Sequence, residues 1–168
     1  MSVFTENLVV SPLPDGRTWV LRKKFSYDVG REGSGETIKV SVGFVTDFAS
    51  VPRVFWWIFP KWGKYGNATV IHDYLYWTQQ EKYSRKRADE IFLEGMRDAL
   101  GVSTIKAYLL YYFVRAGGWM AWRKNKKDKQ KRIRKFIKLT DEMIEIPRMI
   151  LKGIDPNEIT ATDNTTNG

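Results

Sequence analysis

The chain is 168 residues long, rich in aromatic side chains and basic, with a formal net charge of +9. It has no cysteine, which excludes disulfides and a thiol nucleophile, and its single histidine argues against a catalytic zinc centre. This length suits one domain with a hydrophobic core. The sequence predicts an α+β fold, with one domain over residues 1–153 and a flexible polar tail over residues 154–168.

A small antiparallel β part is expected over about residues 1–50, and residues 1–52 are assigned to it. Alternating apolar residues predict one strand within Arg17–Val29 and another within Glu36–Phe44. The glycine-rich stretch Gly30–Gly35 is expected to form the turn between them. A structured loop over Val45–Pro52 then closes the β part.

Residues 53–153 are predicted to form a helical part, beginning with a short helix over Arg53–Phe59. Two core helices follow, one capped by Asn67 and the other by Ser84. The first ends at about Gln79, and the second near Leu100, before a glycine that favours a helix end. Because the connection between the two is short, we expect them to pack antiparallel.

A third helix is predicted with Ser103 as its N-terminal cap and a kink at Gly117-Gly118. The helical pattern resumes at Ile133, beyond a basic stretch. The apolar run Ile105–Trp122 contains two basic residues and is too interrupted to cross a membrane. The N-terminal residues lack the features of a signal peptide, so neither a signal peptide nor a transmembrane segment is expected.

The positive charge is concentrated in a basic segment, residues 123–135, which carries nine Lys and Arg residues and one Asp. Such a segment can neutralise nucleic-acid phosphates or dock on anionic lipid headgroups. A solvated helix face is the commonest alternative for a run of charge. The residues predicted to contact nucleic acid or a membrane are Arg123, Lys124, Lys126, Lys127, Lys131 and Arg132.

The single histidine, His72, shares a helix face with Tyr76, four residues later. A histidine can act as a general base near neutral pH when a carboxylate orients its ring. Asp73 points about 100° away round the helix, whereas Asp89 can reach His72 from an antiparallel neighbouring helix. The alternative is a buried His–Asp pair that only satisfies hydrogen bonds, and a His–Asp dipeptide by itself favours this alternative.

The loop Gly43–Arg53 is a second candidate, because Asp, Thr, Ser and Pro close together favour side-chain-to-backbone hydrogen bonds. Such a loop can present backbone carbonyls and a carboxylate to a hard cation such as calcium. Asp73, if it does not orient His72, is free to hold a cation as well. The spacing alone favours an ordinary turn.

Three motifs resemble a family found widely in tailed-phage genomes and catalogued only as domain of unknown function 1353. They are Gly43-Phe44-x-Thr46-Asp47-x-Ala49-Ser50-Val51-Pro52-Arg53, His72-Asp73-x-Leu75-Tyr76 and Ala88-Asp89-x-x-Phe92. The resemblance covers roughly residues 15–120. It implies a phage origin, in the host cytoplasm or in the virion, but no activity.

The helical part also resembles secretory phospholipase A₂ of the small bacterial and fungal branch. The matching patterns are His-Asp-x-x-Tyr at His72–Tyr76, Asp-x-x-Phe-x-x-x-Met at Asp89–Met96, and Tyr111–Gly117. The resemblance also extends to the calcium loop, matched by Asp47–Pro52. The chain departs from that family in lacking cysteine and in its basic C-terminal extension.

That resemblance implies a catalytic role for His72 as the base that activates water, with Asp89 orienting it and Tyr76 supporting Asp89. It further implies that Asp73, Asp47 and the backbone carbonyl of Phe48 hold calcium, which stabilises an oxyanion. The first hypothesis is a calcium-dependent, phospholipase-like hydrolase that acts on host membrane lipid. The second is a non-enzymatic virion or host-interaction protein, whose basic segment binds nucleic acid, a membrane, or a phage or host protein.

Overall fold

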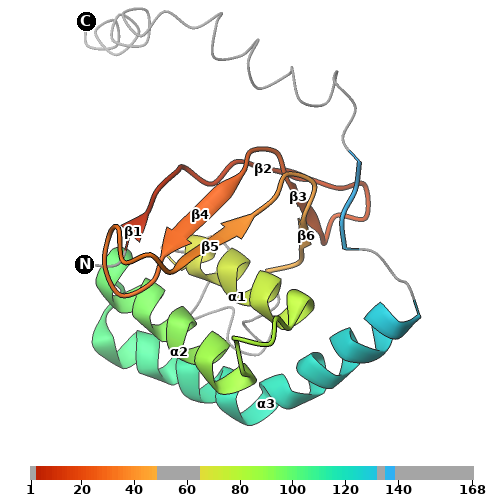
Figure 1. Ribbon diagram of the computed structural model, residues 1–168. Coiled ribbons are helices and arrows are strands. Elements are labelled where there is room, and N and C mark those ends of the chain that lie inside the picture. The colour runs from red at the N-terminus through yellow and green to blue at the C-terminus, as the bar shows by residue number, and fades with distance from the viewer. Residues whose placement is uncertain (1–2, 49–64, 132–134, 139–168) are drawn as a thin grey trace, which may run out of the picture. The chain divides into compact units, whose positions relative to one another are not determined.

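The computed structural model describes residues 3–48, 65–131 and 135–138. The chain divides into two units, Met1–Ile137 and Lys138–Gly168, and the described strands and helices all lie in the first. Its described residues form an α+β fold, as predicted, with six strands in two antiparallel sheets, three α-helices and one π-helical turn. Figure 1 shows the helices gathered on one side of the sheets, with α1 (Gly66–Thr78) nearest to them and α3 (Thr104–Gln130) farthest away.

Each sheet has three short strands. The first sheet has the order β1-β4-β5, formed by Val3–Phe4, Phe25–Asp28 and Thr37–Val40. The second has the order β2-β3-β6, formed by Val10–Pro12, Trp19–Leu21 and Val45–Thr46.

Two predictions for the β part therefore need correction. The stretch Arg17–Val29 holds two strands in different sheets, because the chain leaves the ladder at three consecutive basic residues, 22–24, and crosses between the sheets. The predicted loop begins with strand β6, where Val45 pairs with Val20 and Thr46 with Trp19. This pairing places Thr46 within hydrogen-bonding distance of Asp73 in the first helix.

Glu94, the last residue of helix α2 (Arg85–Glu94), joins the first sheet to the helices. Its carboxylate accepts hydrogen bonds from the Tyr27 hydroxyl at 2.8 Å and from the backbone N–H of Gly30 at 2.7 Å. Gly30 begins the predicted turn between β4 and β5, and its φ of +80° is a conformation that glycine adopts without strain. The turn and the sheet are thus held at a fixed distance from α2.

The helices are α1 (Gly66–Thr78), α2 (Arg85–Glu94) with its π-helical continuation η2 (Gly95–Ala99), and α3 (Thr104–Gln130). The predicted Ser84 cap is confirmed, since its side chain accepts a hydrogen bond from the N–H of Arg87 at 3.1 Å. The predicted Asn67 cap is wrong: α1 begins at Gly66, two residues earlier than that cap implies, with Tyr65 at the cap position and no side-chain cap. Ser103 does occupy the cap position of α3, but its side chain makes no capping hydrogen bond.

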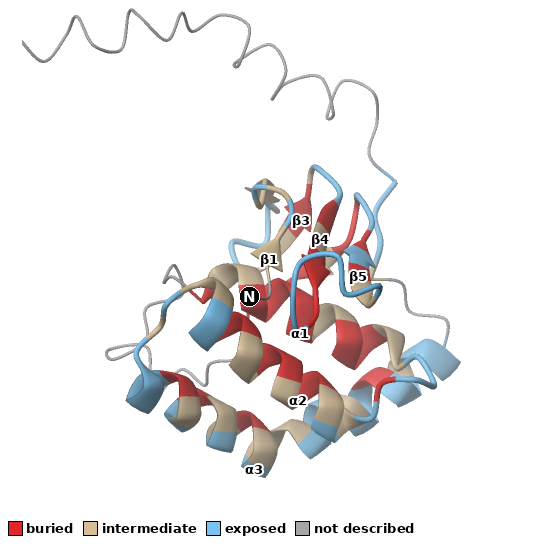
Figure 2. Ribbon diagram, turned by 60° about the vertical axis from the view of Figure 1, so that its left-hand side comes forward, coloured by how far each residue is buried: buried red, intermediate tan, exposed pale blue. Residues whose placement is uncertain are grey.

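The first two helices are antiparallel, as expected from their short connection. Asp89 contacts His72 and Tyr76, whereas Gly95, further along the chain, lies beside Ala68 near the start of α1. Helix α3 runs without a break through Gly117-Gly118, although both ribbon views show it bent along its length (Figures 1 and 2).

After α3 the chain returns to the sheets. Lys135 accepts a hydrogen bond from the N–H of Val45 at 2.9 Å, and the N–H of Ile137 donates to Gly43 at 2.8 Å. The helix predicted to resume at Ile133 is therefore wrong for residues 135–138. Gly43, at φ +86°, lies so close to Ile137 that a Cβ atom would overlap its carbonyl oxygen.

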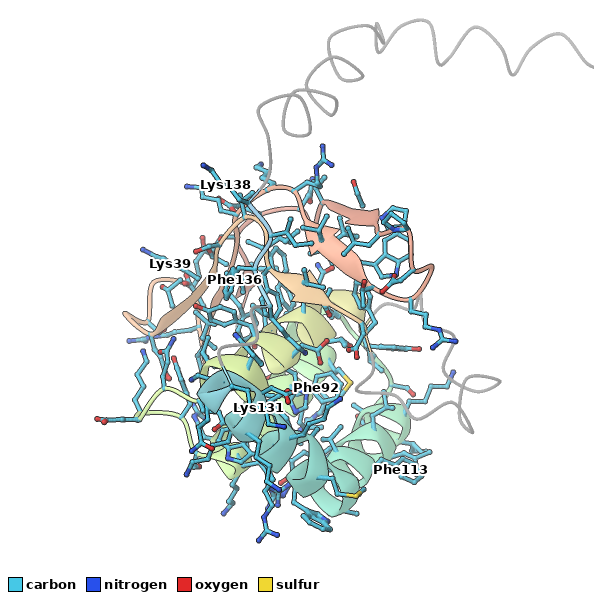
Figure 3. The ribbon with its side chains drawn as sticks, turned by 90° about the vertical axis from the view of Figure 1, so that its right-hand side faces the viewer. Lys39, Phe92, Phe113, Lys131, Phe136 and Lys138 are labelled. Atoms are coloured by element: carbon cyan, nitrogen blue, oxygen red, sulfur yellow. The ribbon has the colours of Figure 1, made fainter. Side chains whose placement is uncertain are left out.

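Figure 3 shows Phe136 of this returning segment lying over the sheet part, and its ring is 5.5 Å from that of Phe44. The predicted helix over Arg53–Phe59 and the predicted tail over 154–168 lie outside the described residues.

Two groups of buried side chains make up the core. The ribbon in Figure 2 is coloured by burial, and its red, buried residues lie in both the strands and the helices. The larger group joins the sheets to α1 and the start of α2, with Phe25, Phe44 and Leu75 almost fully buried. The smaller group joins α2 and η2 to α3 through Phe92 and Leu110. The His72 ring contacts both groups, since it lies 4.2 Å from the ring of Tyr76 in the larger group and 4.8 Å from that of Phe92 in the smaller.

Candidate functional site

His72 and Asp89 form a direct, buried hydrogen bond. Nε2 of His72 lies 2.8 Å from Oδ1 of Asp89, and the two side chains are 3% and 0% exposed. The bond joins α1 to α2. The predicted approach of Asp89, rather than Asp73, to the imidazole is therefore present in the structure.

The tautomer of His72 follows from the state of Asp89. Burial alone would raise the pKa of Asp89, but hydrogen bonds from His72, Tyr76 and Arg115 outweigh it and hold the pKa below its ordinary value. An ionised carboxylate can only accept hydrogen bonds, so Nε2 carries a proton and donates it. In the neutral ring, the lone pair that can accept a proton then lies on Nδ1.

Tyr76 and two arginines complete the surroundings of Asp89. The Tyr76 hydroxyl donates to Oδ1 at 2.6 Å, and Nη1 of Arg115 donates to Oδ2 at 2.6 Å. Arg85, one helical turn before Asp89, approaches Oδ2 at 3.4 Å and also donates to the carbonyl of Arg115 at 3.0 Å. Side chains from α1, α2 and α3 therefore converge on one carboxylate.

Residues of α3 contact Tyr76 at both its ring and its hydroxyl. Burial raises its pKa, and the adjacent Asp89 carboxylate raises it further, so the hydroxyl remains a protonated donor. Trp122 of α3 packs edge-on against its ring at 5.1 Å. Gly118 lies against the hydroxyl, where an added Cβ atom would overlap it. Helix α3 can approach Tyr76 this closely only because position 118 has no side chain.

The side chain of Asp73 is directed to strand β6, as its position about 100° from His72 round the helix predicts. Its Oδ2 accepts a hydrogen bond of 2.5 Å from the Thr46 hydroxyl, which in turn accepts from the N–H of Phe48 at 3.2 Å. Burial raises the pKa of Asp73, and the negative charge of Asp47 raises it further, while Lys135 and the Thr46 hydrogen bond oppose the rise. Asp47 and Asp73 are therefore close enough to repel each other.

The chemistry of this carboxylate pair fits a hard cation in kind. Calcium takes six to eight oxygen ligands, and two carboxylates supply part of such a set. The residues that the structure describes contain no cluster of three His, Cys, Asp or Glu side chains, so backbone carbonyls and water would have to supply the rest. Phe48 adopts φ 52°, unusual for a residue with a side chain, and its ring packs against Trp19.

A pocket of about 380 Å³ joins the two halves of the site. His72, Asp73, Asp47 and Tyr76 line one part of it, and residues of α3 line the other. Two basic side chains, Lys124 and Lys135, also face this space. The described α3 lining residues are Phe113, Val114, Gly117, Gly118, Met120, Ala121, Lys124, Asn125 and Asp128.

The predicted basic contact residues lie at the C-terminal end of α3, and one of them, Lys124, also lines the pocket. Arg123, Lys124, Lys126, Lys127 and Lys131 are all exposed, whereas Arg132 lies outside the described residues. Arg123 stacks on Trp119 at 5.2 Å. Lys129, which was not singled out from the sequence, donates to the carbonyl of Thr78 at 2.7 Å and so ties α3 to the end of α1.

Four site residues had no assigned role in the sequence prediction. Arg85 precedes Asp89 by four residues, a spacing that favours an ion pair on a helix. Arg115 interrupts an apolar helix, a pattern that points to a buried acidic partner without identifying it. Thr46 and Lys135 interact with Asp73 only because distant segments of the chain pack together. No pattern among neighbouring residues in the sequence predicts these interactions.

The fold and the site together define an α+β protein with a buried His–Asp–Tyr–Arg cluster beside a pocket that contains two further carboxylates. The chain belongs to the family described as protein of unknown function DUF1353, whose profile matches residues 19–114. That match includes all the predicted catalytic and metal residues but ends before Arg115 and the basic segment. No curated protein and no solved structure matches the chain.

Proposed function

We propose that this protein is a phospholipase-like hydrolase, encoded by a phage, that cleaves an ester bond of host membrane lipid. One arrangement supports the proposal above all. His72 is hydrogen-bonded to a buried, ionised Asp89 and lines the same pocket as Asp47 and Asp73. A core pair that only satisfied hydrogen bonds would not need this pocket or the neighbouring carboxylates.

In the proposed reaction, His72 removes a proton from water through Nδ1, while its Nε2–H continues to donate to Asp89. The water oxygen attacks the ester carbonyl carbon. When the ester C–O bond breaks, the leaving alcohol takes the proton back from the imidazolium. Asp89 does not accept the proton: it stabilises the charge on the ring, and Tyr76 and Arg115 keep it ionised.

Asp47, Asp73 and the carbonyl of Phe48 are the proposed calcium ligands. Calcium, when bound there, would supply positive charge for the carbonyl oxygen of the ester. Without a cation, the two carboxylates repel each other, and burial already disfavours the charge on Asp73. Lys124 and Lys135 lie along the same pocket and offer positive charge to a lipid phosphate.

The test is release of fatty acid from phospholipid vesicles, measured by mass spectrometry with calcium and with a chelator. The informative variant is His72→Gln, because the glutamine amide can still donate to Asp89 but cannot act as a base. We expect hydrolysis to fall at least about 100-fold in this variant and to stop with chelator. The matched control is Asp98→Asn, at an exposed carboxylate on η2.

If the wild type hydrolyses lipid and His72→Gln does so at the same rate, His72 is not the base. If hydrolysis continues in chelator, the proposed calcium site is not needed for the reaction. No hydrolysis of any phospholipid, with the fold intact, would favour the second function, a non-enzymatic virion or host-interaction protein. The observation in favour of that function is the group of exposed basic residues at the end of α3. It predicts binding that weakens with salt and is indifferent to His72→Gln.

A further inference from the structure

The outer face of α3 carries large apolar side chains in contact with solvent. Ile105 is 83% exposed, Tyr112 63%, Met120 59% and Trp119 47%. Together with Leu109, these residues make up what we term the α3 stripe. Successive members are four, three, seven and one residues apart, and at about 100° per residue these spacings put all five along one side of the helix, opposite the buried Leu110 and Val114. A soluble surface rarely exposes such a row without a partner.

The charge next to the stripe indicates the partner. The same helix continues into Arg123, Lys124, Lys126 and Lys127, all exposed. Helix α3 contains seven basic residues and a single acid, Asp128. A row of aliphatic and aromatic side chains that runs into a cationic helix end is the composition of helices that lie in the surface of an anionic membrane.

Two other partners fit these observations less well. A second copy of the chain would bring two strongly cationic helices together, with almost no acid on α3 to compensate. A nucleic acid would neutralise the basic residues but leave Ile105, Tyr112 and Trp119 in water. Lipid headgroups and the adjoining acyl chains accommodate both kinds of side chain.

We propose that the α3 stripe and the basic residues that follow it form a docking surface for anionic phospholipid membranes. Met120 connects this surface to the site, since it is exposed and also lines the pocket. Phe113, another lining residue, lies on α3 at the edge of the helical part, as Figure 3 shows. Docking would therefore bring the pocket to the lipid surface. It does not require hydrolysis, so this proposal and the proposed function can fail separately.

The test measures partition of the protein onto sedimented vesicles, in the His72→Gln background so that no lipid is cleaved. Vesicles of phosphatidylcholine are compared with vesicles that also contain phosphatidylglycerol. We expect at least tenfold stronger binding to the anionic vesicles, since each basic residue near the surface contributes roughly a fivefold factor. The triple variant Ile105→Ser/Tyr112→Ser/Trp119→Ser should lose at least about tenfold in binding.

The pair Lys126→Gln/Lys127→Gln tests the charge independently, and should lower binding to anionic vesicles and weaken its salt dependence. Matched controls are Val42→Ser and Lys39→Gln, at exposed positions on the sheet part (Lys39 is labelled in Figure 3). Unchanged binding in both the triple and the lysine variants would overturn the proposal. So would a wild-type dimer that the triple variant converts to monomer, or tighter binding to duplex DNA than to anionic vesicles.

Discussion

Substituting one of two adjacent glycines in α3 should destabilise the protein, whereas substituting the other should stabilise it. Gly117 and Gly118 both lie inside the helix, where alanine is favoured over glycine by about 1 kcal/mol. An added Cβ atom meets nothing within 4 Å at Gly117, but at Gly118 it overlaps the hydroxyl of Tyr76. The two positions therefore differ only in what faces them.

The cost at Gly118 has two parts. Forcing an extra methyl group into a packed contact costs about 1–3 kcal/mol. Moving the Tyr76 hydroxyl away from Asp89 removes a 2.6 Å hydrogen bond to a buried charge, which is worth roughly 1.5–3 kcal/mol. Even if only part of the second cost applies, it exceeds the gain in helix propensity. We expect Gly118→Ala to lower the free energy of unfolding by about 2 kcal/mol and Gly117→Ala to raise it by up to about 1 kcal/mol.

Urea unfolding followed by tryptophan fluorescence measures this difference directly, with both variants studied at the same pH and salt. A gap of about 3 kcal/mol corresponds to a difference in melting temperature of roughly 6–12 °C for a chain of this size. The variant Gly118→Ala/Tyr76→Phe adds a check, because removing the hydroxyl should relieve part of the overlap. If both alanine variants change stability by the same amount, α3 does not approach Tyr76 as described, and the packing of the site is wrong.

Three further predictions concern the charges and the returning segment. Arg115→Met should lower the free energy of unfolding by about 2 kcal/mol at pH 7, against little change for the exposed Arg97→Met. The pKa of Asp89 in the folded state lies below its ordinary value of 3.8, so this loss of stability should fade only as the pH falls below about 4. Urea unfolding from pH 7 to pH 3 measures the loss at each pH. A loss that does not change with pH would contradict the ion pair. Asp73→Asn should melt at or above the wild-type temperature in chelator, because folding raises the pKa of Asp73 and so disfavours its charge at neutral pH. In calcium the order should reverse, and equal calcium-induced shifts in both proteins would exclude Asp73 as a ligand. Gly43→Ala should release the segment 135–138 from the sheets, because alanine is strained at this positive φ and its Cβ would overlap Ile137. Faster tryptic cleavage after Lys135 would show the release. The control is Gly35→Ala, which is also at positive φ but has no atom within 4 Å of the added Cβ.

The contacts within α1 and between α1 and α2 could be predicted from the sequence. His72 and Tyr76 are one turn apart, and the short connection after α1 fixes the direction of α2, so that Asp89 can reach both. The Ser84 cap is equally local. Each of these features depends on helical geometry or on a short connection, and both are set by residues close together in the chain.

The contacts that could not be predicted join distant segments. Arg115 is 26 residues from Asp89, and Thr46 is 27 residues from Asp73. The apolar spacing around Ile137 resembles a helix, but pairing of this segment with the backbone of Gly43 and Val45 outweighs that local preference. Helix propensity is a weak bias, and tertiary hydrogen bonds of this kind routinely override it.

Asp89 has both a structural and a proposed chemical role, and the two can be separated. It accepts hydrogen bonds from side chains of α1 and α3 and from Arg85 of its own helix, so its removal would disturb the packing of the helical part whatever the function. A buried ion pair is seldom more stabilising than an apolar cluster of the same volume, so stability alone gives a weak reason for this arrangement. His72→Gln retains a donor to Asp89 and should unfold much like the wild type, whereas Tyr76→Phe removes a donor and keeps the imidazole. If the site is catalytic, His72→Gln should abolish hydrolysis at nearly full stability, and Tyr76→Phe should lose stability while retaining a measurable rate.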